Sequence, residues 1–451
     1  MITRPLLLLF FCSLVLSANA QQYKQMMYDH NVNFYSVITE AESYFSINGK
    51  GKGSGWKGFQ RWAENNEYKF YPTGDRINVD PFLVKNAHKA NSQFKTLYPN
   101  GWSELGPVSP GQITGHYAFG MGRVVCFYVD PSNVQTLYLG SRTGGFWKSM
   151  DGGMSWSGGS TDTLAASGVN TIAVSPTNSD SILININNSS NHYTHGIYRS
   201  INGGNSWSLS NFNPTNLGWG GLGSNREIYK IKYHPTIPDL IFIGTRDGLY
   251  KSTDNLSTWS VPVSGDDFTD IDFHPTNPSI VYAYAKNNPN VVYVSTDTGA
   301  TFTQTPIPGS AGGVGTIQVS ASCPGCVYYM SNNGLWKSTN NGASFVLISN
   351  PGESDAGFAV SDLNDSNILA GYVDAFFSTD GGANFSQVTY WSLGNTNGAG
   401  SGHQISYNTS TDYIHADLQA AECLNGIFYA VTDGFMVKSS DNGANWEILS
   451  E

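Results

Sequence analysis

Charged residues are scarce in this 451-residue chain, in which Asp, Glu, Lys and Arg together make up only 13%. Basic residues are the scarcer kind, because residues 101–451 hold 12 Lys and Arg against 27 Asp and Glu. Proteins bind nucleic acid largely by neutralising phosphates with basic side chains, so this composition argues against a nucleic-acid partner. Residues 21–100 carry 10 basic and 7 acidic side chains, an excess too small to change that expectation.

Hydrophobic runs long enough to span a bilayer are also missing, and we therefore predict no membrane insertion. The longest apolar run lies in the first twenty residues, MITRPLLLLFFCSLVLSANA, where Arg4 precedes an apolar core and a small-x-small ending. This pattern is typical of a cleaved secretory signal peptide over residues 1–20. The sequence thus predicts a secreted, periplasmic or cell-surface protein whose mature chain starts near Gln21.

Cysteine is rare, with five in the chain, and Cys12 falls within the predicted signal peptide. Cys323 and Cys326 are separated by Pro-Gly, which suits a local disulfide in an exported protein, although free thiols remain an alternative. A zinc site would need a second pair with CxxC spacing, which the sequence lacks. We therefore predict neither a metal nor a cofactor.

Glycine and aromatic residues are abundant, and an eight-residue motif first seen as SMDGGMSW recurs seven times. The copies begin at residues 149, 200, 252, 295, 338, 378 and 439. Four short strands separate each copy from the next, and this spacing is typical of propeller blades. The sequence predicts an all-β, seven-bladed β-propeller of four-stranded antiparallel blades over residues 101–451. Residues 21–100 form a partly helical N-terminal segment, with helices expected over 35–45 and 80–94.

The third motif position is an acidic residue or its amide, and we predict that it stabilises a hairpin turn. Its side chain can accept backbone N–H groups, as in an Asx-turn, and the following glycine can adopt a positive φ. Asparagine replaces aspartate in two copies, which suits a structural carboxylate better than a catalytic one. In the third copy Leu256 replaces the glycine. The predicted structural residues are Asp151, Asn202, Asp254, Asp297, Asn340, Asp380 and Asp441.

These motifs resemble the Asp-box, or BNR, repeat with its pattern S/T-x-D-x-G-x-T/S-W/F, and the resemblance covers residues 118–451. Sialidases, xyloglucanases, sortilin-type receptor domains and photosystem II assembly factors are similar in construction. Residues 50–76 and 102–107 resemble exported repeat proteins of Bacteroidota-type bacteria, many of which end in a type IX secretion sorting domain. The chain ends just after its seventh motif without such a domain. We therefore expect either another export route or a truncated piece of a longer protein.

Irregular loops are expected on the propeller face opposite the repeated motif, and loops on a rigid scaffold commonly carry binding sites. Two tryptophans there can stack on a sugar or pack against a partner, and the alternative is that they cap the blades. Charged residues on the same face can surround the channel mouth, although they also suit ordinary tight turns. The candidate binding residues are Trp219, Trp391, Arg123, Arg226, Arg246, His415 and Asp417.

Two functions remain open. The resemblance to sialidases implies three converging arginines with a Tyr–Glu pair, and that to xyloglucanases implies a carboxylate pair between two propellers, whereas one propeller is predicted here. We therefore assign no catalytic residue and favour an exported, monomeric, non-enzymatic scaffold that binds a polysaccharide or protein. The alternative is a glycoside hydrolase, sialidase-like or xyloglucanase-like, and two carboxylates about 5–10 Å apart would be its signature.

Overall fold

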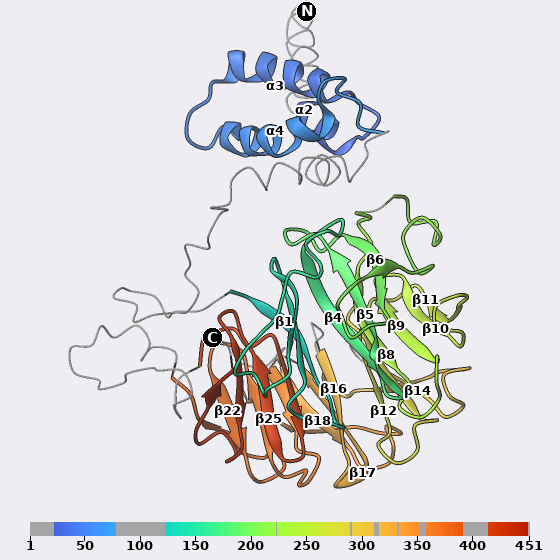
Figure 1. Ribbon diagram of the computed structural model, residues 1–451. Helices are drawn as coiled ribbons and strands as arrows, with labels where there is room; N and C mark the ends of the chain where they lie inside the picture. The colour runs from blue at the N-terminus through green and yellow to red at the C-terminus, as the bar shows by residue number, and fades with distance from the viewer. Residues whose placement is uncertain are drawn as a thin grey trace, which may run out of the picture. The chain divides into compact units, whose positions relative to one another are not determined.

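The computed structural model describes residues 22–77, 122–221, 223–288, 291–310, 315–331, 333–351, 357–390 and 414–449. Contacts divide the chain into two compact units, residues 1–103 and 104–451, and the sequence analysis places the boundary at residue 100. The first unit contains helices and the second contains seven sheets (Figure 1). The predicted signal peptide lies outside the described residues.

Three helices form the described part of the first unit: α2 (Gln22–Tyr28), α3 (Phe34–Asn48) and α4 (Trp56–Phe70). The predicted helix over 35–45 is α3, and Asn33 caps it by accepting the N–H of Tyr35 at 2.9 Å. Helices α2 and α4 were not predicted. The helix predicted over 80–94 lies outside the described residues.

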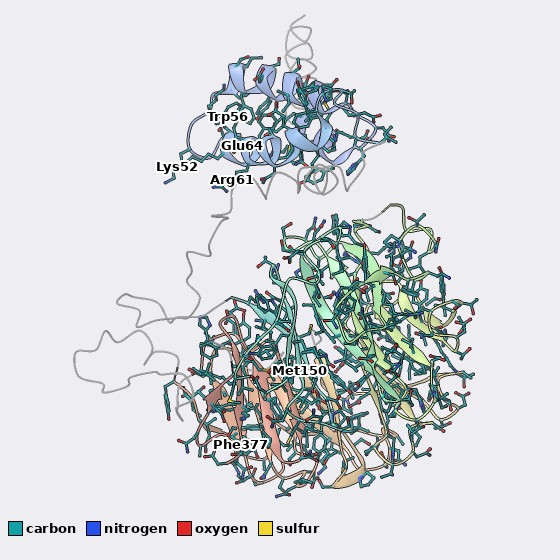
Figure 2. The ribbon with its side chains drawn as sticks, in the orientation of Figure 1. Lys52, Trp56, Arg61, Glu64, Met150 and Phe377 are labelled. Carbon is teal, nitrogen blue, oxygen red and sulfur yellow. A yellow bond between two sulfur atoms is a disulfide. The ribbon has the colours of Figure 1, made fainter. Side chains whose placement is uncertain are left out.

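Aromatic rings supply most of the core of this helical unit. Tyr23 from α2 packs against Phe45 from α3 and Phe59 from α4, with ring centroids 5.2 and 5.8 Å apart. Trp56, which is labelled in Figure 2, is the first residue of α4 and packs edge-on against Phe45, with ring centroids 5.0 Å apart. Burial of large aromatic side chains therefore holds the three helices together.

Arg76 is buried beneath this core and is only 6% exposed. Its guanidinium donates to the carbonyl oxygens of Met26 (2.8 Å), Met27 (2.6 Å), Asp29 (3.0 Å) and Val32 (3.3 Å). These carbonyls lie at and just beyond the end of α2, where a helix leaves its last acceptors without intrahelical partners. One side chain thus satisfies the C-terminal end of α2 and ties it to the chain after α4.

Seven antiparallel sheets form the second unit, which confirms the predicted seven-bladed β-propeller. Blade one contains β1 (Val124–Val129), β2 (Leu137–Ser141) and β3 (Gly145–Ser149). Blade two contains β4 (Gly168–Ser175), β5 (Asn178–Asn187), β6 (Thr194–Ser200) and β7 (Ser208–Leu209). Blade three contains β8 (Ile228–Tyr233), β9 (Ile241–Thr245), β10 (Gly248–Ser252) and β11 (Ser260–Ser264).

The remaining four blades follow in chain order. Blade four contains β12 (Phe268–Phe273), β13 (Val281–Ala285), β14 (Val291–Ser295) and β15 (Thr303–Pro306). Blade five contains β16 (Gly315–Ser320), β17 (Cys323–Ser331), β18 (Gly334–Ser338) and β19 (Val346–Ser349). Blade six contains β20 (Gly357–Val360), β21 (Ile368–Gly371), β22 (Ala375–Ser378) and β23 (Ser386–Gln387). Blade seven contains β24 (Ala420–Leu424), β25 (Ile427–Val431), β26 (Met436–Ser439) and β27 (Glu447–Ile448).

Within each blade the strands pair in sequence order, and the first strand of each blade is the innermost. Blade one differs in having three strands, because only an isolated bridge between Lys148 and Ser157 stands where a fourth strand is expected. Blades one and seven meet through hydrogen bonds from Val124 N to Thr432 O (3.1 Å) and from Trp156 Nε1 to Leu449 O. Buried apolar side chains fill the spaces between neighbouring blades.

The seven repeated motifs form turns between the third and fourth strand positions of each blade, as predicted from the sequence, and we call them the repeat turns. In the first, Gly153 N donates to Ser149 Oγ (2.9 Å) and the Ser149 hydroxyl donates to Asp151 Oδ1 (2.8 Å). The backbone N–H and hydroxyl of Ser155 then donate to the two oxygens of Asp151 (2.9 and 2.6 Å). The carboxylate therefore closes the turn on both sides.

Asparagine stabilises the same turn, but its side-chain amide donates the hydrogen bond that the aspartate carboxylate accepts. In the second repeat turn Asn202 Oδ1 accepts the N–H of Ser206 (3.0 Å), while its Nδ2 donates to the Ser206 hydroxyl (2.9 Å). The third turn shows how strongly the backbone shape is specified, because Leu256 keeps the positive φ (68°) that glycine has in the other turns. A non-glycine residue in this conformation costs about 1–2 kcal/mol, which burial of the Leu256 side chain offsets.

Acid should weaken the repeat turns, because hydrogen bonding lowers the pKa of Asp151 and Asp380 from 3.8 to about 2, and the hydroxyl of Ser155 and the amide of Asn384 contribute most. A carboxyl whose pKa is lower in the folded protein contributes stability above its unfolded pKa and loses it as the pH falls toward 2. Thermal unfolding followed from pH 4 down to pH 2 should therefore show a falling melting temperature. The double variant Asp151→Asn with Asp380→Asn should show a shallower fall, and an unchanged slope would contradict this account.

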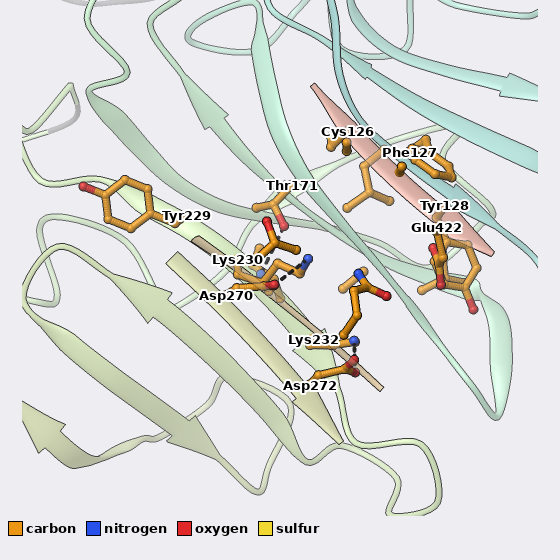
Figure 3. A pocket seen from close by; sticks show the side chains of 18 of the residues that line it. Cys126, Phe127, Tyr128, Thr171, Tyr229, Lys230, Lys232, Asp270, Asp272 and Glu422 are labelled. Carbon is orange, nitrogen blue, oxygen red and sulfur yellow. Dashed lines mark hydrogen bonds and ion pairs between the residues drawn. The ribbon is translucent and has the colours of Figure 1, made fainter. Parts of the chain in front are cut away.

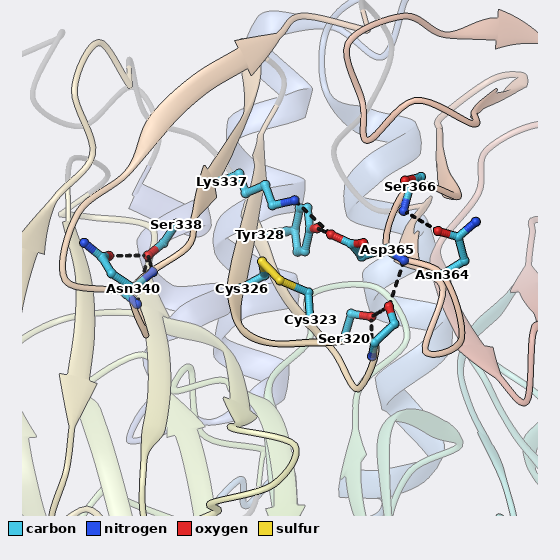
Figure 4. The surroundings of a disulfide bond; sticks show 12 residues. Ser320, Cys323, Cys326, Tyr328, Lys337, Ser338, Asn340, Asn364, Asp365 and Ser366 are labelled. Carbon is cyan, nitrogen blue, oxygen red and sulfur yellow. Dashed lines mark hydrogen bonds and ion pairs between the residues drawn. A yellow bond between two sulfur atoms is a disulfide. The ribbon is translucent and has the colours of Figure 1, made fainter.

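Cys323 and Cys326 form the predicted local disulfide at the start of β17 (Figure 4). Both cysteines lie within β17, directly after the turn that follows β16. Asp365 lies within 4.8 Å of the two sulfurs and bonds to Lys337 and Tyr328 instead. The disulfide occupies the thiols that a metal would need.

Candidate functional site

The strand order gives the propeller two different faces. The repeat turns and the turns after the innermost strands lie on one face, and the loops joining second to third strands and blade to blade lie on the other. We call the second face the loop face. It carries every candidate binding residue that the sequence analysis named, apart from Trp391, which lies outside the described residues.

On the loop face the first and last blades meet in a polar network centred on Arg123, the residue before β1. Arg123 Nε lies 3.1 Å from Asp433 Oδ1, and Arg123 Nη2 donates to Gln419 Oε1 at 2.7 Å. Gln419 Nε2 donates to Asp433 Oδ1 and to the main-chain oxygen of Asp417, both at 3.0 Å. Gln419 also lines the central channel. With His415, these residues form what we call the mouth cluster.

The electrostatics of the mouth cluster converge on Asp433. Burial raises the pKa of this carboxyl, and the neighbouring Asp417 raises it further, while Arg123, His415 and Arg142 oppose the change. Two carboxylates and three groups that can be cationic therefore act on one another at this mouth. A carboxyl whose pKa is shifted by burial and by specific neighbouring charges is characteristic of binding and catalytic sites.

Local backbone geometry holds two members of the mouth cluster in unusual positions. Asp417 has a φ of 62°, in the left-handed region that residues other than glycine seldom adopt. His415 packs edge-on against Phe435, and a Cβ at Gly434 would come within 2.6 Å of its ring. A side chain at position 434 would therefore displace His415, and backbone strain such as that at Asp417 concentrates at functional sites.

The other two predicted arginines form a separate group in blade three. Arg226 pairs with Asp247, and Arg246 lies 3.4 Å from Glu227. Both contacts stay within the blade, so each guanidinium already has a carboxylate partner. The structure therefore divides the predicted arginines between two ion-paired clusters, with Arg123 in one and Arg226 and Arg246 in the other.

Trp219 lies in the loop between blades two and three, where its ring packs edge-on against Phe212 and Tyr250, with centroids 6.1 and 6.0 Å apart. The side chain is partly buried and adds to the apolar cluster of blade three. This position favours the blade-capping alternative over sugar stacking. Tyr390, the last described residue before the loop that contains Trp391, is 41% exposed.

The central channel encloses about 550 Å³ and is lined by the innermost strands (Figure 3). Its wall carries charges that the sequence analysis did not single out. Lys230 pairs with Asp270 at 3.0 Å and Lys232 with Asp272 at 2.5 Å, and both pairs join β8 to β12. Glu422 projects from β24 into the same channel. The sequence did contain a signal for these channel charges, because they are interspersed with apolar residues in the strand segments YKIKY, FTDIDF and AAECL.

No family model matches this chain. A xyloglucanase from Paenibacillus sp is 25% identical over 208 residues, which represent 42% of this chain and 19% of that protein. The GH74 enzyme of Niastella koreensis superposes with a TM-score of 0.56 at 17% identity, covering 75% of this chain and 55% of that one. YCF48 from Cyanidioschyzon merolae superposes with a TM-score of 0.50 at 13% identity. The match covers 71% of this chain and 96% of that one. The chain thus spans about half of the GH74 enzyme, and both structural matches support the propeller fold alone. Of the helices that the structure describes, none has the length and apolar character to cross a membrane.

Proposed function

We propose that this protein is an exported binding protein whose propeller holds an extracellular saccharide at the mouth cluster. The observation that carries the proposal is the network of Arg123, Gln419 and Asp433, which joins the first and last blades on the loop face. Sugar hydroxyls both donate and accept hydrogen bonds, and an arginine, an amide and a carboxylate offer both kinds of partner. The similarity to a xyloglucanase, whose name denotes action on a glycan, supports a saccharide as the ligand.

The existing bonds orient the mouth cluster without using all of its capacity. Arg123 carries five N–H donors and Asp433 about four acceptor sites, so both retain groups for a ligand. Their ion pair fixes the side chains beforehand, which lowers the entropy that binding would otherwise cost. The Asp433 side chain is 26% exposed, so the site is partly shielded from water, and hydrogen bonds to a ligand are stronger there.

Screening the mature chain on a glycan array, followed by calorimetry with the best ligand, tests this proposal. Asp433→Asn and Arg123→Gln should each weaken binding about tenfold or more, which corresponds to loss of roughly one charge-assisted hydrogen bond. Lys438→Gln is the matched control, because it breaks an ion pair to Glu447 (3.2 Å) on the outer strands of the same blade. Unchanged affinity in both site variants, or an equal loss in the control, would contradict the proposal.

A second candidate function is glycoside hydrolysis, and one observation favours it. Asp417 and Asp433 act on each other electrostatically, and the pKa of Asp433 is raised, as the acid of a carboxylate pair requires. In that case the protein would release reducing ends from a soluble glycan such as xyloglucan. Asp417→Asn and Asp433→Asn would each lower the rate about a hundredfold or more, and Lys438→Gln would not. Binding without release of reducing ends would favour the first function.

A further inference from the structure

The central channel contains one acidic group whose charge has no partner. Glu422 makes no hydrogen bond and no ion pair with any residue that the structure describes, although its side chain lies among channel-lining residues. The walls raise the pKa of this carboxyl, chiefly by burial, while Lys232 and Lys230 lower it from a distance. The Glu422 side chain is nevertheless exposed to the channel space. The carboxylate of Glu422 therefore lies inside the channel without an ion-pair partner among the described residues.

The two lysines that line the channel form ion pairs with other residues. Lys230 and Lys232 each hold an aspartate of β12, at 3.0 and 2.5 Å, and Asp272 also accepts the N–H of Phe273. Counting all charged residues that line the channel, two lysines face four acids, the fourth being Asp362, which accepts two backbone N–H groups. The channel thus favours an additional positive charge, and Glu422 is the acid still free to bind one.

Polar groups on other blades also line the channel and could hold the remainder of a small ligand. The Gln318 amide lines the channel and makes no hydrogen bond within the described part of the chain, and the Thr269 hydroxyl is buried without a partner. The aromatic ring of Phe127 lines the channel, and Tyr128 lies within electrostatic reach of Glu422, as Figure 3 shows. An aromatic face next to a carboxylate is a favourable surrounding for an ammonium group.

We propose that the channel is a second binding site, in which Glu422 receives the primary ammonium group of a small ligand. The volume of about 550 Å³ accommodates a ligand of monosaccharide size. At the face of the repeat turns, the channel is lined by prolines in the turns after β1, β4 and β8, namely Pro131, Pro176 and Pro235. The ammonium group can come from an amino sugar or from a lysine side chain, which share this chemistry. Gln419 of the mouth cluster also lines the channel, whereas Glu422, three residues further on in β24, belongs to the channel site alone.

Matched ligand pairs test the proposal by calorimetry on the mature protein. Glucosamine is compared with glucose, and Nα-acetyl-lysine amide with its norleucine counterpart, so that each pair differs in the ammonium group. We expect the charged member of at least one pair to bind about tenfold more tightly or better, and that pair identifies the source. Glu422→Gln should remove the preference. Equal binding within both pairs, or no binding of any probe, would overturn the proposal.

The stability of the unliganded protein gives an independent readout. Because Glu422 has no partner to lose, Glu422→Gln should leave the melting temperature unchanged or raise it. A lower melting temperature would mean that Glu422 serves the lysines as a structural counter-ion, and that result would overturn the proposal. Glu447→Gln is the matched control for ligand binding, since Glu447 lies on the outermost strand of the same blade. Loss of saccharide binding at the mouth cluster would leave this result unaffected.

Discussion

Replacing Arg76 by methionine is expected to unfold the three-helix unit of the full-length chain while leaving the propeller intact. The substitution keeps an apolar stem but removes the guanidinium that donates to the four carbonyl oxygens at and beyond the end of α2. Hydrogen bonds to a charged group contribute about 1.5–3 kcal/mol each, and partly buried carbonyls that lose a donor add to the loss. A small unit has only a few kcal/mol of stability to lose.

Hydrogen exchange measured by mass spectrometry on the full chain separates the two units. Peptides from α2, α3 and α4 should lose protection in the Arg76→Met variant, whereas peptides from the blades should not change. Arg61→Met is the matched control, because Arg61 is an exposed residue of α4 (Figure 2). Full protection of α2 in the Arg76 variant would show that the buried guanidinium is not required there.

Trp446→Ala should be among the most damaging single substitutions in the propeller. Trp446 ends the seventh repeat turn, is fully buried, and belongs to the apolar cluster that joins blades six and seven. Truncating a buried tryptophan typically costs about 3–5 kcal/mol, because the lost contacts leave a cavity. Its indole nitrogen has no hydrogen-bond partner within the described residues, so the loss should come from packing alone.

Denaturant unfolding of the mature protein measures this effect. Trp147→Ala provides the control, because Trp147 is 38% exposed on β3 and should lose well under half as much stability. Trp446→Phe should recover much of the loss, since a phenyl ring refills most of the volume and no hydrogen bond needs replacing. Equal destabilisation by the two alanine substitutions would refute the packing account.

The propeller was predictable because its information is local and repeated. Each blade repeats the alternation of strands and the repeat turn, and the exchange of aspartate for asparagine identified Asp151 and Asn202 as structural. Helix α4 was not predicted, because its aromatic residues are interspersed with Gly58 and two asparagines. These residue types have weak helix propensity. Trp56, Phe59 and Trp62, each three residues from the next, were the sequence signal for this helix.

The candidate site was predictable only in part. Arg123, His415 and Asp417 were chosen from their loop positions, and the structure places them in one cluster with Gln419 and Asp433. The pairing of Arg226 and Arg246 with carboxylates of their own blade depends on side-chain geometry that loop position does not encode. Glu422 was missed because a single acid in an inner strand resembles many solvent-facing residues until the ring places it inside the channel.

The contacts between blades one and seven differ from all others in how far along the chain they reach. Within a blade the strands pair with close neighbours in sequence, whereas Arg123 and Gln419 are 296 residues apart and Trp156 and Leu449 are 293 apart. Local contacts within a blade form rapidly. Bringing blades one and seven together closes a loop of nearly the whole propeller, and this junction therefore carries the largest loss of chain entropy. Ring closure should therefore be the late, slow event in folding. A ligand that binds at the mouth cluster would contact both blades and thereby stabilise the closed ring.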